Sequence, residues 1–199
     1  VKSLITKNTA AILIEPIQAE GGVRSADPEF MKELDQIRKE HNIALIFDEI
    51  QCGMGRTGYL YSYMLYGVEP DILTSAKGIG NGFPVGAVLI SHKIGAVAGM
   101  LGTTFGGNHL ACAAALAVLS VIEEEDLMDN AVKIGEYISK ELSSCNSVSE
   151  IRGRGLMIGI ELKEGYEKIK ESLLFQKCVF TGSAGSNVVR ILPPLNITI

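Results

Sequence analysis

The chain has 199 residues, of which 47% are hydrophobic and 21% are charged, and this composition excludes a disordered protein. The net charge is −5 and no long basic run is present, so neither nucleic acid nor an anionic membrane is an expected partner. The four cysteines and three histidines are scattered, which argues against a metal site and favours a reducing, cytoplasmic environment.

The two ends of the chain carry no recognisable targeting signal. No charged segment precedes a long apolar one, so we expect no signal peptide and no membrane span. The chain begins at Val1, without methionine, and stops in the apolar residues 195–199. We therefore expect a chain that is truncated at both ends.

The first half of the chain predicts strands that alternate with helices. Asp27 before Pro28 predicts the N-terminus of a helix that ends near residue 41, and residues 18–25 are predicted to form a loop. Because the apolar runs are short and rich in β-branched residues, they favour buried strands of an α/β protein. These strands are expected at residues 10–14, 43–47, 71–74 and 85–90.

The second half has a different pattern. Helical periodicity covers residues 109–122 and 128–142. Residues 148–162 predict two strands around a glycine-rich turn, followed by a helix at 164–175 and a strand at 188–192. A short polar stretch near residue 145 separates the two patterns, so we predict one domain at residues 1–145 and a smaller one at 146–199.

Two ionisable residues follow two of the predicted strands. Asp48 comes directly after an apolar run, and Lys77 follows the next strand and precedes three glycines. Open α/β sheets bind ligands beyond the carboxyl ends of their strands. Either residue alone has an ordinary explanation, since Asp48 suits a helix cap or a loop and Lys77 suits the protein surface.

Pyridoxal phosphate (PLP) would use both residues. An aspartate beside its pyridine nitrogen keeps that nitrogen protonated, so that the ring can accept electrons when a C–H bond breaks. A lysine condenses with its aldehyde to form a Schiff base and can then move the proton. Spacing alone does not identify this cofactor.

A competing pattern is the glycine motif at residues 53–58, GMGRTG, which matches the dinucleotide fingerprint G-x-G-x-x-G. Four residues separate the motif from the preceding strand, whereas the fingerprint belongs at the turn from strand to helix. Dinucleotide binding also leaves Asp48 and Lys77 without a role. It is kept as an alternative.

Four segments resemble motifs of the class III PLP-dependent aminotransferases in the expected order. Within that class, two further segments, at residues 152–157 (RGRGLM) and 190–195 (RILPPL), are most similar to the acetylornithine aminotransferases. The four class motifs lie at residues 15–22 (EPIQAEGG), 47–58 (FDEIQCGMGRTG), 75–78 (SAKG) and 103–108 (TTFGGN). The resemblance covers essentially the whole chain.

The resemblance implies a role for each candidate residue. Asp48 would pair with the pyridine nitrogen, Gln51 would hydrogen-bond near the ring hydroxyl, and Lys77 would be the catalytic Schiff-base lysine. Thr104 would bind the PLP phosphate of the neighbouring subunit of a homodimer, with Thr103 beside the substrate.

Two more residues would recognise the substrate. Arg190 would bind its α-carboxylate, and Glu20 would be the gating glutamate that pairs with this arginine in alternation with the substrate. Without the resemblance, Gln51, Arg190 and Glu20 suit loop or surface positions, and Thr103 or Thr104 suits a helix cap.

The resemblance also implies the fold and the reaction. The fold would be part of the large domain of a fold-type-I PLP enzyme plus part of its small α+β domain. The reaction would transfer the δ-amino group of N-acetylornithine or N-succinylornithine to 2-oxoglutarate in arginine biosynthesis, with ornithine or 4-aminobutyrate as alternative donors.

The family's amino-terminal half is absent from the chain. That half carries the phosphate loop, the aromatic residue that stacks on the ring, and a second substrate arginine. A catalytically silent fragment is therefore a further alternative.

Overall fold

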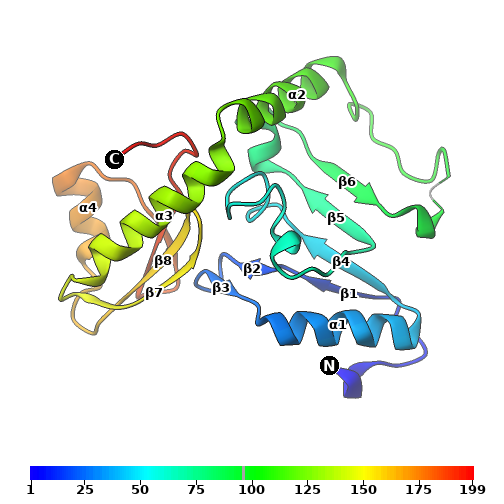
Figure 1. The fold of residues 1–199 in the computed structure, drawn as a ribbon, viewed down its shortest axis with the longest axis horizontal. Coiled ribbons are helices and arrows are strands. Elements are labelled where there is room, and N and C mark those ends of the chain that lie inside the picture. Colours follow the sequence, from blue (N-terminus) through cyan, green and yellow to red (C-terminus); the bar gives the residue numbers. More distant parts are fainter. Residues whose placement is uncertain (96) are drawn as a thin grey trace.

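The computed structural model describes residues 1–95 and 97–199, which form two four-stranded sheets joined by two consecutive helices, and a two-stranded hairpin (Figure 1). The first sheet has the order β1-β4-β5-β6, with β1, β4 and β5 parallel and β6 antiparallel to β5. Its strands are β1 (Ala11–Ile14), β4 (Ala44–Asp48), β5 (Ile72–Ser75) and β6 (Ala87–Ile90). All four predicted strands are thus confirmed, within two residues at their ends.

Helix α1 (Pro28–His41) covers one face of this sheet. The Asp27 carboxylate accepts hydrogen bonds from the backbone N–H groups of Glu29 (2.8 Å) and Phe30 (3.2 Å), as expected of the predicted N-cap. The buried side chains of Met31 and Leu34 pack with Leu45 and Phe47 of β4. Burial of this stripe of α1 fixes the direction of β4 and so the position of Asp48.

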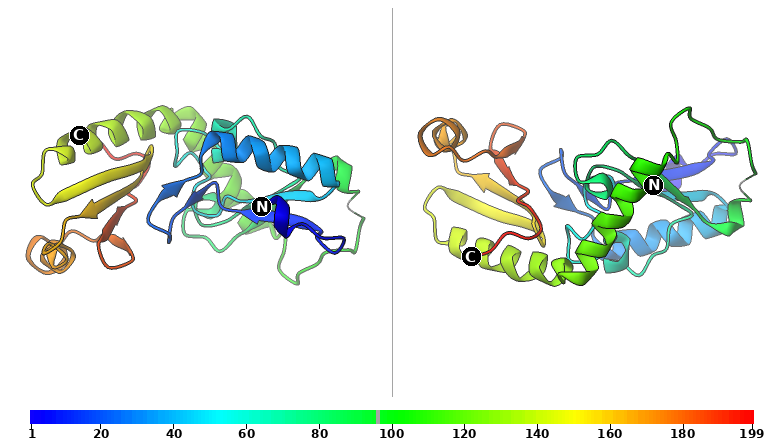
Figure 2. Two further views of the ribbon diagram at one scale, coloured as in Figure 1. Left: turned by 90° about the horizontal axis from the view of Figure 1, so that it is seen from below. Right: turned by 90° about the horizontal axis from the view of Figure 1, so that it is seen from above.

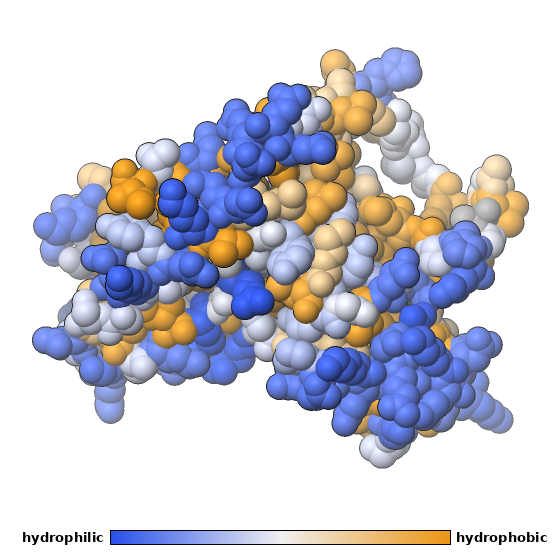
Figure 3. Space-filling model, viewed as in Figure 1, coloured by the Kyte–Doolittle hydropathy of each residue, from blue (hydrophilic) through white to orange (hydrophobic). Residues whose placement is uncertain are grey.

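The opposite face of the first sheet is only partly covered by the described residues. One cross-strand row runs through Leu13, Ile46, Ile72 and Ile90, and Leu13 is 67% exposed. In Figure 3 the hydrophilic outer surface of α1 contrasts with the hydrophobic side chains around β6 and α2.

A long turn region lies between β4 and β5. Residues 50–61 form turns and bends, and the 3-10 helix η2 (Ser62–Leu65) follows them. The region predicted as a loop at 18–25 contains instead part of a hairpin, β2 (Ile17–Gln18) with β3 (Arg24–Ser25). Strands of two residues are too short to show alternation, which is why the sequence pattern missed them.

Three 3-10 helices mark other turns of the chain. They are η1 (Lys2–Leu4), η3 (Lys77–Gly80) and η4 (His92–Ile94). Of these, η3 matters for the site because it begins at Lys77.

Helices α2 (His109–Glu124) and α3 (Leu127–Ser143) carry the chain from the first sheet to the second (Figure 2). The second sheet is antiparallel, with the order β7-β8-β10-β9. Its strands are β7 (Val148–Arg154), β8 (Met157–Leu162), β9 (Gly182–Ala184) and β10 (Val188–Ile191). The boundary proposed at residue 145 remains a prediction, although α3, which precedes it, packs on β7 and β8.

The last helix, α4 (Ile169–Lys177), starts five residues later than expected at 164. Residues 163–168 form turns instead, and Gly165 there has a φ of +88°, which is incompatible with a helix. Among the described residues, no helix is both long and apolar enough to cross a bilayer.

Candidate active site

The carboxyl ends of β4 and β5 meet at one edge of the first sheet. The two strands are parallel neighbours, and Asp48, the last residue of β4, lies opposite Thr74 of β5. Lys77 follows the end of β5 by two residues. Because these strand ends are adjacent, Asp48 and Lys77 project from the same edge, where α/β sheets bind ligands.

Asp48 is half-buried, and one of its carboxylate oxygens is already used. Its Oδ1 accepts a hydrogen bond of 3.0 Å from the backbone N–H of Ile50. Within the described residues, Oδ2 accepts none, so one oxygen remains open to a cationic group. The carboxylate is therefore held in place without being neutralised by the chain itself.

Lys77 has an unusual backbone conformation. Its φ is +49°, in the left-handed region that a non-glycine residue seldom adopts. Such a conformation costs of order 1–3 kcal/mol and persists only where the surroundings impose it. The neighbouring Gly78 packs closely on Met54, since a Cβ at Gly78 would lie 3.1 Å from the Met54 Cβ. This contact holds the strained turn against the loop that follows Asp48.

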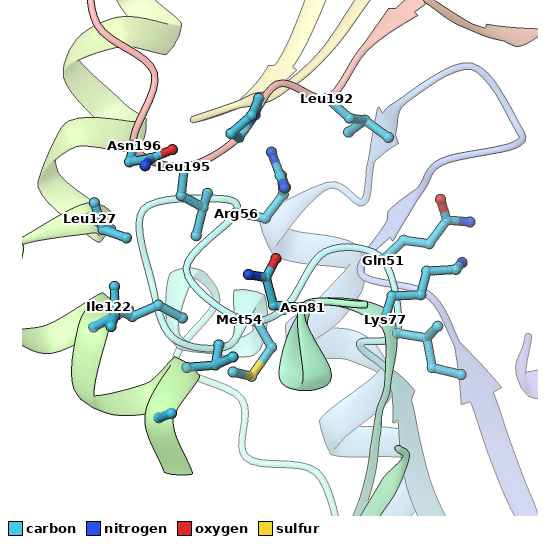
Figure 4. A pocket seen from close by; sticks show the side chains of 17 residues that line it. Gln51, Met54, Arg56, Lys77, Asn81, Ile122, Leu127, Leu192, Leu195 and Asn196 are labelled. Atoms are coloured by element: carbon cyan, nitrogen blue, oxygen red, sulfur yellow. The ribbon is translucent and has the colours of Figure 1, made fainter. Parts of the chain in front are cut away.

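Lys77 and Gln51 lie at one side of a cavity of about 480 Å³ (Figure 4). The cavity is formed between the turns after β4 and β5, helix α2 and the segment after β10. None of its described lining residues is acidic, whereas Lys77 and Arg56 are both basic. An anionic ligand is therefore the electrostatically favoured occupant.

Arg190 of β10 approaches the site from the second sheet. Its Nη1 lies 2.6 Å from Glu20 Oε1 and 3.5 Å from Gln51 Oε1. The hydrogen bond and the positive charge of Arg190 lower the pKa of Glu20 from its ordinary value. Arg190 Nε is buried without a partner among the described residues, so the guanidinium keeps donor capacity for another acceptor.

Glycines make room for this arginine in the second sheet. Arg190 lies opposite Gly159 of β8 and Gly182 of β9. A Cβ at Gly182 would come within 3.0 Å of Arg190 Nε. The sheet therefore lets the guanidinium lie across it toward Glu20 and Gln51.

The turn after Asp48 is held by a buried carboxylate that sequence reasoning missed. Glu49 is 1% exposed and accepts hydrogen bonds from the backbone N–H groups of Ser62 (2.9 Å) and Tyr63 (2.7 Å). The Cys52 thiol donates to the same carboxylate at 3.2 Å. Burial and the charge of Glu49 raise the pKa of Cys52, so this thiol stays protonated as a donor. Three donors around one acid fix the path of residues 49–62 and so the position of Gln51.

Thr103 and Thr104 lie apart from these residues. Both are exposed, in the loop between η4 and α2, and no hydrogen bond among the described residues joins them to Lys77 or Arg190. The N-cap of α2 is Asn108, whose side chain accepts from Ala111 N at 2.9 Å. Neither threonine is therefore the cap of this helix.

The glycine motif at 53–58 does not have the surroundings that dinucleotide binding requires. No α-helix follows it directly, since turns lead from it into the four-residue η2. The dinucleotide fingerprint places a helix N-terminus at the pyrophosphate. This alternative is therefore wrong.

The whole chain, residues 1–199, matches the family model described as "Aminotransferase class-III". The chain belongs to the class III aminotransferases. Members of this class are PLP-dependent, and the α/β arrangement with a mixed sheet fits a part of the fold-type-I architecture. The expected family, fold class and cofactor are thus confirmed.

Curated relatives of this class III chain include two that act on acylated ornithines by name. It is 46% identical to the acetylornithine aminotransferase of Methanocaldococcus jannaschii, over 98% of the chain and 50% of that protein. It is also 46% identical to the succinylornithine transaminase of Photorhabdus laumondii, over 99% of the chain and 51% of that protein. The chain thus spans about half the length of these relatives.

Solved structures agree with this assignment. The acetylornithine aminotransferase of Elizabethkingia anophelis superposes with a TM-score of 0.88 at 36% identity, covering 99% of this chain and 52% of that one. An ornithine aminotransferase of Plasmodium yoelii gives a TM-score of 0.85 at 34% identity, covering 96% and 53%.

The residues present fit the cofactor of the class. Asp48 offers an open carboxylate oxygen for a protonated pyridine nitrogen, and Lys77 offers an amine at the edge of a cavity without acidic residues. Thr74 Oγ1, buried on the strand beside Asp48, has no partner among the described residues. An unpaired donor at this position suits a polar ligand next to the aspartate.

Proposed function

We propose that the protein transfers the δ-amino group of an N-acylated ornithine to 2-oxoglutarate in arginine biosynthesis, as a PLP enzyme of the cytoplasm. One observation carries the proposal: a lysine and an aspartate at adjacent strand ends face an arginine whose present partner is a displaceable glutamate. The names of the acetylornithine and succinylornithine relatives support the choice of donor.

Asp48 and Gln51 orient the cofactor in this proposal. Asp48 keeps one carboxylate oxygen open for the pyridine nitrogen, and Gln51 hydrogen-bonds near the ring hydroxyl. Bound PLP supplies an acceptor for the electrons released when a substrate C–H bond breaks. Glu49 keeps both residues in place through its three hydrogen bonds to the turn.

Lys77 attaches the cofactor and then moves a proton. Its Nζ takes the proton from the substrate carbon that bears the reacting amino group. Lys77 has a left-handed backbone, and Figure 4 shows its side chain beside that of Gln51. The alternation of donor and acceptor substrates at one site corresponds to a ping-pong sequence.

Arg190 binds the substrate α-carboxylate, and Glu20 takes its place when that carboxylate is absent. The planar guanidinium suits a bidentate carboxylate, and its unpartnered Nε is available for a second hydrogen bond. Glu20 is exposed, so it can leave Arg190 for solvent at little cost.

Thr104 serves the neighbouring subunit of a homodimer by binding the phosphate of its PLP, and Thr103 lies beside that subunit's substrate. Their exposure within this chain supports a role in an interface. Ornithine is a second candidate donor, because the similar solved structures include ornithine aminotransferases.

The test is a transamination assay of the intact protein with 2-oxoglutarate and four donors: N-acetylornithine, N-succinylornithine, ornithine and 4-aminobutyrate. We expect the acylated ornithines to give the highest kcat/KM. Lys77→Ala should abolish turnover and also the irreversible attachment of PLP to the protein by borohydride. A preference for free ornithine would mean that ornithine, and not an acylated ornithine, is the amino donor. If the native enzyme is active but carries no PLP on Lys77 after borohydride treatment, the proposal is overturned. The 199-residue chain, assayed alongside, distinguishes a catalytically silent fragment.

A further inference from the structure

The glycine-rich turn at residues 53–58 packs against elements that come much later in the chain. A Cβ at Gly55 would lie 3.4 Å from Leu195 Cδ1 and 3.4 Å from Met128 Cγ. At Gly58 it would lie 2.3 Å from Val132 Cγ2, on α3. The glycines of this motif therefore allow close contact with α3 and with the segment after β10.

Arg56, in the middle of this turn, joins the two sheets. Its Nη1 donates to the carbonyl oxygen of Pro193 and, at 3.5 Å, to that of Leu156. The backbone N–H of Leu156 in turn donates to the Arg56 carbonyl oxygen at 2.9 Å. Leu156 is fully buried, so this end of the connection is rigid. Arg56 thus holds both the β7–β8 turn and the segment after β10.

Each end of this connection leads directly to a candidate site residue. Gln51 lies five positions before Arg56 in the same turn region, and Arg190 lies three positions before Pro193. The side chains of Gln51 and Arg190 approach to 3.5 Å. A shift of Pro193 relative to Arg56 would therefore move the guanidinium of Arg190 relative to Gln51.

We propose that Arg56 is a positioning residue for carboxylate recognition: it fixes Arg190 beside Gln51 through Pro193 and Leu156. This inference rests on the proposed function, in which Arg190 binds the substrate carboxylate. Arg56 lines the cavity, but its side-chain hydrogen bonds go to the carbonyl oxygens of Pro193 and Leu156, so in this proposal it acts through Arg190. Small errors in placement are costly, since about 1 Å of misplacement can reduce a rate by about 100-fold.

The test compares Arg56→Met, Arg190→Met and the double variant in the intact holoenzyme. The readouts are kcat, the KM for the acceptor substrate 2-oxoglutarate, and the calorimetric Kd for glutarate, a dicarboxylate that cannot react. We expect Arg56→Met to raise KM and Kd by about tenfold, with the cofactor absorbance unchanged. In the Arg190→Met background, Arg56→Met should raise KM and the glutarate Kd by less than about twofold more, because the residue through which Arg56 acts is gone.

Arg38→Met is the matched control. Arg38 is also a buried arginine, but it belongs to α1 and pairs with Asp71. The substitution Arg38→Met should lower thermal stability without changing the glutarate Kd. Arg56→Lys, which keeps a cation of similar reach, should give an intermediate Kd and decides the question if Arg56→Met does not fold.

The outcomes separate this inference from the proposed function. If Arg190→Met leaves the glutarate Kd unchanged, the role of Arg190 is wrong and the role of Arg56 falls with it. If Arg190→Met weakens binding but neither Arg56 variant does, only the inference about Arg56 is overturned. An additive effect in the double variant would mean that Arg56 contacts the substrate directly, which also overturns it.

Discussion

Glu20 and Arg190 are 170 positions apart in the chain, and their side chains meet at 2.6 Å beside Gln51. The hairpin of β2 and β3 carries the acid, and the second sheet carries the arginine. The side chain of Glu20 is 68% exposed and that of Arg190 is 13% exposed. The acid is therefore the member of the pair that can move away.

Replacing Glu20 should strengthen the binding of carboxylate ligands. In Glu20→Gln the competing charge is absent, so a dicarboxylate no longer has to displace it from Arg190. Because exposed ion pairs are weak, we expect the glutarate Kd of the intact holoenzyme to fall only about two- to fivefold. Calorimetry measures this, with Glu136→Gln on α3 as the control. A weaker affinity in Glu20→Gln would contradict the competition.

The same pair should give a pH dependence with a defined sign. The pKa of Glu20 is lowered by Arg190, so the ion pair is complete above the ordinary carboxyl range and is lost as pH falls through the lowered pKa. We expect the native protein and Glu20→Gln to differ in glutarate affinity near about pH 7 and to converge below about pH 4. Taking the ratio of the two Kd values cancels the ionisation of glutarate. A constant ratio across this range would refute the assignment.

Substitutions of Lys77 should separate backbone strain from chemistry. Alanine keeps the penalty of a left-handed φ, whereas glycine removes it. The free energy of unfolding of Lys77→Gly should therefore be up to about 1 kcal/mol higher than that of Lys77→Ala. Urea denaturation of the PLP-free protein measures the difference. Both variants should lose at least about 100-fold in kcat.

Lys133, an exposed residue within α3, provides the control for this strain. There the order should reverse, because glycine costs about 1 kcal/mol relative to alanine inside a helix. Equal stabilities of Lys77→Gly and Lys77→Ala would mean that Lys77 is not strained.

Cys52 should be unreactive while the protein is folded. Its thiol is 1% exposed and its pKa is raised, first by burial and then by the charge of Glu49. At about pH 8, iodoacetamide should modify Cys145 readily, because its thiol is exposed. Modification of Cys52 should stay at least about 100-fold slower until denaturant is added. Peptide mapping by mass spectrometry follows both sites, and similar rates would contradict the buried hydrogen bond to Glu49.

The ion pair of Arg38 and Asp71 should be important for stability but not for binding. Arg38 Nη1 lies 2.7 Å from both carboxylate oxygens of Asp71, and Asp71 also accepts a hydrogen bond from Leu45 N at 2.9 Å. Arg38→Met leaves a buried carboxylate unpaired and should cost about 3 kcal/mol of unfolding free energy. Denaturant titration measures the loss. Adding Asp71→Asn should recover part of it, and a loss no larger than that of an exposed arginine would show that the pair is not buried.

Much of the fold follows from local patterns in the sequence. Apolar runs gave the strands that end at Asp48 and Ser75, and Asp27 with Pro28 gave the start of α1. Such patterns predict well because each depends on neighbouring residues: alternation defines a strand and a cap satisfies the first N–H groups of its own helix. The motifs around Lys77 and Asp48 were sufficient for the family and the cofactor.

The tertiary structure alone decided how distant segments meet. The resemblance implied that Glu20 pairs with Arg190, but composition and spacing did not, because their contact depends on how the second sheet packs beside the β2–β3 hairpin. Arg56 lies in a segment that resembled the class III aspartate motif and also matched the dinucleotide pattern, but neither pattern indicated that its glycines pack against α3 and Leu195. No pattern in the sequence assigned a role to Glu49, because its three partners are brought to it by a turn. Local propensity fixes elements, whereas burial and hydrogen bonding between elements fix the site, and these depend on the packing of the whole chain.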